Sequence, residues 1–157
     1  MMNGALTIGT LDGANVETRE EVGDENFFLF GLTAHEVEHV KRAGYRPSEY
    51  VNANEELREV LELVVGGHFS RGDREMFRPL VDNLLHADPF LVLADYAAYM
   101  ARQEDVSAAW QDTRRWTRMS ILNTAHAGKF SSDRAIREYC EQIWKIRPVK
   151  IVLEQRP

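Results

Sequence analysis

Two stretches of sequence decide the fold of this chain: ALTIGTLDGANV (residues 5–16) and ENFFLFG (residues 25–31). Residues 5–9 are apolar and β-branched and lead directly into a glycine-containing turn, which is typical of a buried strand. Residues 26–30 predict a second strand, and its run of consecutive apolar side chains indicates burial on both faces, as in a parallel sheet. Because a helical pattern separates the two strands, we expect them to pair in parallel through a right-handed crossover.

The helices are predicted from their caps and apolar periodicity. Asp12 is the expected N-cap of a helix that ends at Val22, before Gly23. Thr33 and Glu36 have the spacing of a capping box at the start of the next helix. A further helix is predicted from Asn54 to Gly66, with a buried stripe of Leu57, Val60, Leu61 and Val64. Another is predicted from Met76 to Leu85, where Pro79 lies in the first turn or kinks the helix. Three more are predicted: one after an Asp95 cap, one around Trp116, Met119 and Leu122, and one that opens at Ser132 or Asp133 and ends at Trp144.

Residues 90–94 predict a third strand, and residues 149–153 a short terminal one. Strands separated by helices predict a single α/β unit with a parallel sheet. The predicted strands are few for so many helices, and the first begins close to Met1. Two explanations stay open on physical grounds. Either the sequence contains a further strand that its apolar pattern does not indicate, or the chain is the second half of a larger sheet. In the second case, the exposed edge of this half must be covered by another element.

The composition excludes several classes of protein. The 157 residues include 19 Lys and Arg and 25 Asp and Glu, and the net charge of −6 argues against nucleic acid or an anionic membrane as the main partner. The single cysteine excludes an internal disulfide and favours a reducing compartment. No apolar run approaches the ~20 residues of a membrane helix, and no basic-then-apolar leader opens the chain.

Residues 35–39, HEVEH, match the H-E-x-x-H signature, in which two histidines bind zinc and the glutamate polarises water. The context argues against a zinc hydrolase, because Glu36 already has a role in the capping box and the neighbouring residues are mostly charged, as on a solvated helix face. No third ligand follows at a recognised spacing. We therefore predict no metal site at His35 and His39.

Two loops lead into helices, whose N-termini attract anions. Residues 7–16 form a strand, a turn and a helix start, but they fit neither G-x-G-x-x-G nor the P-loop. A tight turn with an aspartate cap is the favoured interpretation. Residues 128–134, GKFSSDR, precede the last helix, and the favoured interpretation there is capping by Ser131, Ser132 or Asp133.

The remaining reactive side chains form no constellation. Cys140 falls on the apolar face of the last helix and is interpreted as a core residue. The other groups are also interpreted structurally: scattered histidines (His68, His86, His126), acidic pairs at helix ends (Glu20-Glu21, Asp24-Glu25, Glu55-Glu56) and tryptophans expected in the core (Trp110, Trp116, Trp144). From the residues alone we predict no catalytic, cofactor-binding or metal-binding residue.

A set of segments carries a family pattern: NGALTIGTLDGANVE (3–17), ENFFLFG (25–31), GY (44–45), ADY (94–96), WTR (116–118), GKFSSDR (128–134) and IW (143–144). Their order and spacing resemble the α-glucan (glycogen, maltodextrin) phosphorylase family over about residues 1–145. The resemblance implies that residues 1–145 are the carboxy-terminal segment of a phosphorylase catalytic domain and that residues 146–157 are a divergent tail.

The resemblance implies a B-type glycosyltransferase fold, of which this chain holds the end of the second Rossmann-like domain. It also implies pyridoxal phosphate on a lysine, and release of glucose 1-phosphate from α-1,4-glucan with phosphate as the second substrate. The family lysine lies upstream of the position of Met1, and no lysine precedes Lys41. The strand at residues 5–9 and the turn at residues 10–15 would support the cofactor segment from behind.

We therefore expect a truncated, cytoplasmic phosphorylase segment that binds no pyridoxal phosphate and is inactive alone. The alternative is a non-catalytic interaction module derived from a truncated phosphorylase, which binds its partner through an uncovered sheet edge. Self-association through uncovered apolar faces is expected, whereas nucleic acid and membranes are not expected as partners.

Overall fold

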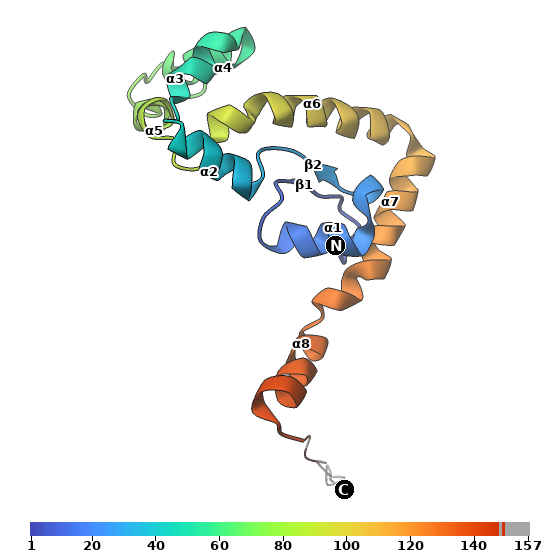
Figure 1. Ribbon diagram of the computed structural model, residues 1–157. Helices are drawn as coiled ribbons and strands as arrows, with labels where there is room; N and C mark the ends of the chain where they lie inside the picture. Colours follow the sequence, from blue (N-terminus) through green and yellow to red (C-terminus); the bar gives the residue numbers. More distant parts are fainter. Residues whose placement is uncertain (148, 150–157) are drawn as a thin grey trace, which may run out of the picture.

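The computed structural model describes residues 1–147 and residue 149. Helices surround a small parallel sheet (Figure 1). The elements are β1 (Ile8–Gly9), α1 (Ala14–Val22), η1 (Asp24–Asn26), β2 (Phe28–Leu29), α2 (Ala34–Arg42), α3 (Pro47–Ala53), α4 (Glu55–Val65), α5 (Arg78–His86), α6 (Val92–Gln111), α7 (Thr113–Ala125), η2 (His126–Phe130), α8 (Ser132–Glu138) and the π-helical turn η3 (Tyr139–Trp144). This arrangement is compatible with the α/β class expected from the sequence, although helices dominate it.

The two strands pair in parallel, as predicted. Ile8 lies opposite Phe28, and Gly9 lies opposite Leu29. The ladder continues past the assigned strands, because the Phe30 N–H donates to the Gly9 carbonyl at 3.2 Å. Each strand is shorter than its apolar run, so the sheet reaches fewer residues than the sequence pattern indicates.

The third strand predicted at residues 90–94 is wrong. Leu91 has a left-handed backbone (φ 56°), and α6 begins at Val92. The Asp88 carboxylate accepts hydrogen bonds from the backbone N–H groups of Val92 and Leu93, each at 2.9 Å. Because this carboxylate satisfies two free donors at the helix start, the apolar run becomes the first turn of α6. Asp95 is therefore not the cap, as the sequence suggested, but lies inside that turn.

The sheet packs against the corner formed by α6 and α7 (Figure 1). Phe28 from β2, Ala109 from α6 and Met119 from α7 are the buried centre of this core. Trp116 packs against it, as predicted. Beside this core, the Asn123 side-chain amide donates to the Ala5 carbonyl, which ties α7 to the segment that leads into β1.

A second core lies at the other end of α6. Helices α3, α4, α5 and the first turns of α6 contact one another around five buried side chains, Val51, Leu57, Leu61, Val81 and Leu93. We call this group the helical cluster. Leu57 and Leu61 are buried as predicted, Val64 packs against this core, and Pro79 lies in the first turn of α5. Val60, however, is 39% exposed, and the prediction that it belongs to the buried stripe is wrong.

The helix starts show which capping predictions hold. The capping box of Thr33 and Glu36 is formed, and the Asn54 side chain accepts from the Leu57 N–H at 3.0 Å. Asp12 is not an N-cap, because Gly13 takes that position with φ 46°. The Asp12 carboxylate instead accepts from the Thr10 hydroxyl at 2.9 Å.

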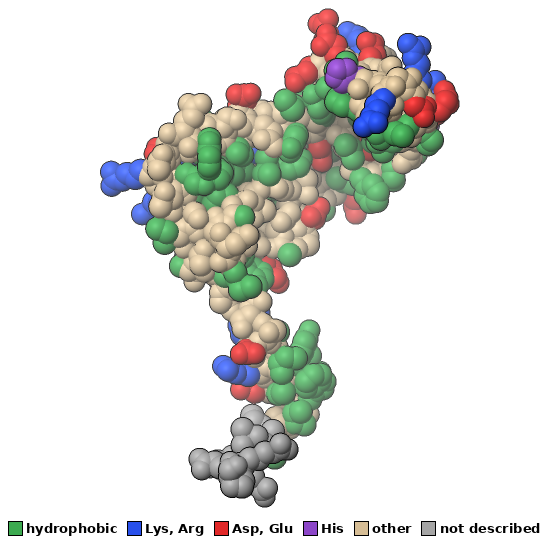
Figure 2. All heavy atoms as spheres, turned by 180° about the vertical axis from the view of Figure 1, so that it is seen from behind, with side chains coloured by type: hydrophobic (Ala, Val, Ile, Leu, Met, Phe, Trp, Pro, Cys, Tyr) green, Lys and Arg blue, Asp and Glu red, His purple; other side chains and the backbone are tan. Residues whose placement is uncertain are grey.

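Helix α8 and η3 form an arm that projects from the rest of the molecule (Figure 1). We call it the C-terminal arm; neither of its elements contains a buried residue. Hydrophobic side chains gather on one side of it (Figure 2), and those exposed there are Ile136, Tyr139, Ile143 and Trp144. The prediction of a buried Trp144 is therefore wrong, and the same holds for Trp110, which is 65% exposed. The strand predicted at residues 149–153 falls largely outside the described residues.

Within the described part of the chain, no helix combines the length and the apolar character that crossing a membrane requires.

Candidate functional site

The first candidate is the turn that follows β1, at the carboxyl end of the sheet. Ligands of open parallel sheets bind at this edge. Here the turn is held by its own residues, because the Asn15 side-chain amide donates to the Thr10 carbonyl at 3.0 Å and the Asn15 N–H donates to the Asp12 carbonyl. Asp12 and Glu17 place two negative charges at this end of α1. These charges oppose an anion, so the geometry supports the tight-turn interpretation.

Residues of α6 and of the loop after β2 meet beside this turn. The Leu32 N–H donates to the Asp95 carboxylate at 2.8 Å. Burial raises the pKa of Asp95 above its usual value, and the negative charge of Asp88 raises it further. The hydrogen bond from the Leu32 N–H acts in the opposite direction and lowers this pKa. Asp95 thus fixes the position of the loop after β2 relative to α6.

The HEVEH segment lies on α2, and both His35 and His39 are exposed. Glu36 is engaged in the capping box, where it accepts from the Thr33 N–H at 2.8 Å and from the Thr33 hydroxyl at 2.7 Å. These hydrogen bonds lower the pKa of Glu36. Among the residues that the structure describes, no group of three or more His, Cys, Asp or Glu side chains is placed to hold a metal ion.

The segment at residues 128–134 joins η2 to α8. Ser131 occupies the N-cap of α8 without a side-chain hydrogen bond. Lys129 instead pairs with Glu21 of α1 at 2.8 Å, and the Arg134 guanidinium bonds both the Lys129 carbonyl and the Glu138 carboxylate. The hydrogen bond between the Lys129 ammonium and the Glu21 carboxylate lowers the pKa of Glu21 and raises the pKa of Lys129. This segment is a polar junction between α1 and the arm.

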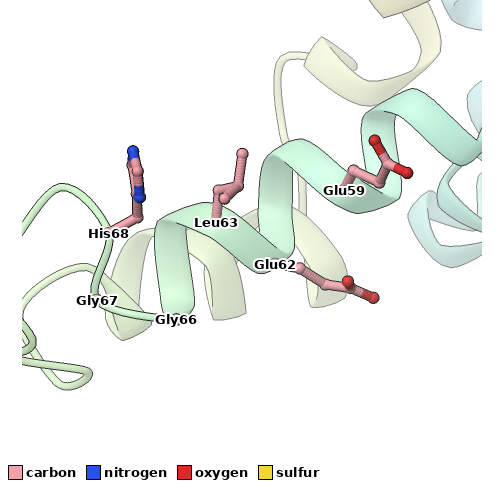
Figure 3. Close-up of a pocket in the computed structure, with 6 residues that line it drawn as sticks. All are labelled: Glu59, Glu62, Leu63, Gly66, Gly67 and His68. Atoms are coloured by element: carbon pink, nitrogen blue, oxygen red, sulfur yellow. The ribbon is translucent and has the colours of Figure 1, made fainter.

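The remaining candidates stay separate. Glu59, Glu62 and His68 line a hollow of about 500 Å³ near the end of α4 (Figure 3). In that view the Glu62 and His68 side chains point in different directions, so no common ligand position results. Cys140 is free and partly buried on the arm, and the structure brings it to none of the other candidate groups.

Sequence reasoning missed one polar cluster. The Tyr45 hydroxyl donates to the buried Asp88 carboxylate at 2.6 Å, and the same carboxylate caps α6. Burial and this carboxylate raise the pKa of Tyr45 far above its usual value. The N-cap residue of α6 is Leu91, so Asp88 lies three residues before the position at which a capping side chain is expected. The usual capping pattern therefore gave no signal for it.

Comparison with known proteins decides the family. The family model described as carbohydrate phosphorylase matches residues 1–146. The chain belongs to the carbohydrate phosphorylase family. It is 61% identical over 153 residues to glycogen phosphorylase of Synechocystis sp., a match that covers 98% of this chain and 18% of the relative. It is 49% identical over 150 residues to the muscle form of glycogen phosphorylase of Bos taurus, covering 96% of this chain and again 18% of the relative.

The chain thus spans less than a fifth of the length of these phosphorylases. Phosphorylases use pyridoxal phosphate, and a Schiff base requires a lysine whose amine loses its proton readily. Lys129 is paired with Glu21, which raises its pKa, and Lys41 donates to the Pro89 carbonyl at 3.2 Å on an exposed surface. Lys145, which directly follows the arm, is exposed. Within the described residues, the lysines do not fit the cofactor.

Proposed function

We propose that this chain is a scaffold segment of a glucan phosphorylase, and that it supports the reacting parts of the enzyme without supplying a reactive group. The match over residues 1–146 carries the proposal, and the pairing of Lys129 agrees with it. The reaction of the whole enzyme is phosphorolysis of α-1,4-glucan to glucose 1-phosphate in the cytoplasm. In this proposal residues 1–145 belong to the end of the second Rossmann-like domain of a B-type glycosyltransferase fold, and residues 146–157 are a tail that diverges in sequence from the family pattern.

In this scaffold role, β1, β2 and the turn after β1 are the elements that position neighbouring parts of the enzyme. Phe28 and Met119 anchor the sheet to α7, and the Thr10–Asn15 turn is held internally by hydrogen bonds. A rigid turn at the carboxyl edge of a parallel sheet positions whatever packs in front of it. The chain therefore orients neighbouring elements, and these carry the cofactor and the glucan.

The first test uses the purified 157-residue chain with pyridoxal phosphate, glycogen and inorganic phosphate. We expect neither Schiff-base absorbance nor glucose 1-phosphate. Turnover by the chain alone, lost on boiling, would refute the scaffold role.

The second test is complementation. The Synechocystis phosphorylase, shortened by the segment that matches this chain, is mixed with the chain, and phosphorolysis is measured. We expect the mixture to be active and each part alone to be inactive. Phe28→Asp, which places a charge in the core beside Met119, should abolish complementation, whereas the exposed substitution Glu104→Gln should not.

The exposed face of the C-terminal arm favours a second candidate, a non-catalytic interaction module that self-associates. Ile143 and Trp144 are 63% and 54% exposed, and exposed apolar groups of this size promote association. Light scattering should show oligomers of the wild-type chain and a monomer for Ile143→Glu combined with Trp144→Glu. Arg137→Glu on the same arm is the charge control, and a monomeric wild-type chain would exclude this candidate.

A further inference from the structure

A cavity of about 570 Å³ opens at the carboxyl ends of β1 and β2. Thr10 and Asp12 follow β1, Phe30 and Leu32 follow β2, and the opposite wall comes from α6. The volume lies within the roughly 300–1,000 Å³ of pockets that bind small molecules. The position is the one at which parallel sheets bind ligands.

Aromatic rings form much of the wall. Phe30 and Tyr99 meet edge to face with centroids 5.1 Å apart, and Tyr96 lies one turn before Tyr99 on α6. The faces of such rings carry partial negative charge and attract cations. Val37 of α2 adds an aliphatic surface, so the cavity suits a ligand with an apolar body.

The charged groups that line the cavity are the carboxylates of Asp12 and Asp95, and no lysine or arginine is among its described lining residues. Asp95 is held in place by the Leu32 N–H at 2.8 Å. Glu36 and Asp88 add negative charge around Asp95. The nearby Lys41 ammonium is bonded to the Pro89 carbonyl. The cavity therefore combines apolar walls with negative charge.

We propose that this cavity binds a small organic cation with an apolar body, an arylalkyl ammonium, whose charged end lies between Asp12 and Asp95 and whose ring packs against Phe30 and Tyr99. This ligand class differs from glucan, which is neutral and polar, and from phosphate, which is an anion. The inference is thus independent of the proposed function, and each can fail without the other.

The test compares three probes of similar size against the full 157-residue chain by calorimetry: 2-phenylethylammonium, 2-phenylethanol and 3-phenylpropionate. The ammonium should bind at least about tenfold more tightly than the alcohol, since partly desolvated charge pairing adds to the apolar contact. The carboxylate should not bind. Equal affinities for the ammonium and the alcohol, or no binding of the ammonium, would overturn the proposal.

Two isosteric variants locate the cation. Asp95→Asn keeps an oxygen that can accept from the Leu32 N–H, and it should weaken ammonium binding by about tenfold. Asp12→Asn, at an exposed position, should weaken it by about threefold. Asp105→Asn, which lies outside the cavity beside Arg102, should leave affinity unchanged. If Asp95→Asn unfolds, Asp12→Asn decides, and an unchanged affinity in Asp12→Asn then refutes the site.

Discussion

The helical cluster and the C-terminal arm carry the same kind of apolar repeat, yet only the cluster buries it. Leu57 on α4 is 3% exposed, whereas Ile143 in η3 is 63% exposed. The cluster has three helices that contact one another and the start of α6. The contacts of the arm run mainly within itself and to η2. An amphipathic pattern therefore specifies which face of a helix seeks cover, and the presence of a neighbour decides whether that face is covered.

The largest expected difference comes from truncating one side chain in each region. Leu57→Ala should lower the free energy of unfolding by about 2–5 kcal/mol, because it opens a cavity in a packed core. Ile143→Ala should change it by less than about 0.5 kcal/mol. Urea unfolding of both variants, followed by circular dichroism, measures the contrast. Equal losses would mean that the arm is packed in solution.

The next comparison uses two tyrosines. Tyr45→Phe removes the hydroxyl that donates to the buried Asp88 carboxylate and should cost about 1.5–3 kcal/mol, the range for hydrogen bonds to charged groups. Tyr139→Phe, at a half-exposed position on the arm, should be neutral. Thermal unfolding of the two variants provides the measurement. A neutral Tyr45→Phe would show that water replaces the hydroxyl at Asp88.

A smaller effect is expected at the helix caps. Asn54→Ala removes the acceptor of the Leu57 N–H and should cost about 1 kcal/mol. Ser131→Ala is the matched control, because Ser131 occupies the N-cap of α8 without a side-chain hydrogen bond. Its urea midpoint should equal that of the wild type. If both variants lose the same stability, the cap of α8 forms in solution.

The smallest effect depends on pH. The hydrogen bonds from Thr33 lower the pKa of Glu36 in the folded chain below its unfolded value of about 4.5. The carboxylate therefore stabilises the fold above pH 4.5, and this contribution is lost as the pH falls through the folded pKa. Urea midpoints of wild type and Glu36→Gln should differ at pH 7 and converge in acid. A constant difference would contradict the capping-box geometry, and Glu104→Gln serves as the control.

Local signals predicted much of the fold. The parallel pairing of β1 and β2, the capping box at Thr33 and the Asn54 cap depend on neighbouring residues, and the structure confirms each one. The strand predicted at residues 90–94 was wrong because the secondary structure of this run depends on Asp88. The Asp88 carboxylate accepts from the Val92 N–H at the start of α6, and the Tyr45 hydroxyl, from a distant segment, donates to the same carboxylate. Short apolar runs do not distinguish a strand from a buried helical turn.

The apolar periodicity of the sequence did not predict helix α3, the exposure of two tryptophans or the cavity. Helix α3 begins with Pro47 and is short, with two buried residues, Pro47 and Val51, so its apolar pattern is weak. Trp110 and Trp144 each contact one other aromatic ring, that of Trp116 and that of Tyr139, yet they remain 65% and 54% exposed, which helical periodicity does not indicate. For the candidate site, the family pattern indicated the family correctly. The cavity beside Asp95, in contrast, requires the loops after β1 and β2 to meet α2 and α6, which no single stretch of sequence specifies.

The bond between Asn123 and the Ala5 carbonyl has a consequence for synthesis on the ribosome. The first strand is made early, but the helix that covers it is made late. At about 5–20 residues per second, the interval between β2 and α7 lasts on the order of 10 s. During that time the nascent polypeptide displays Phe28 and its neighbours without their cover. A chaperone that holds emerging chains would therefore raise the yield of this protein most when translation is slow.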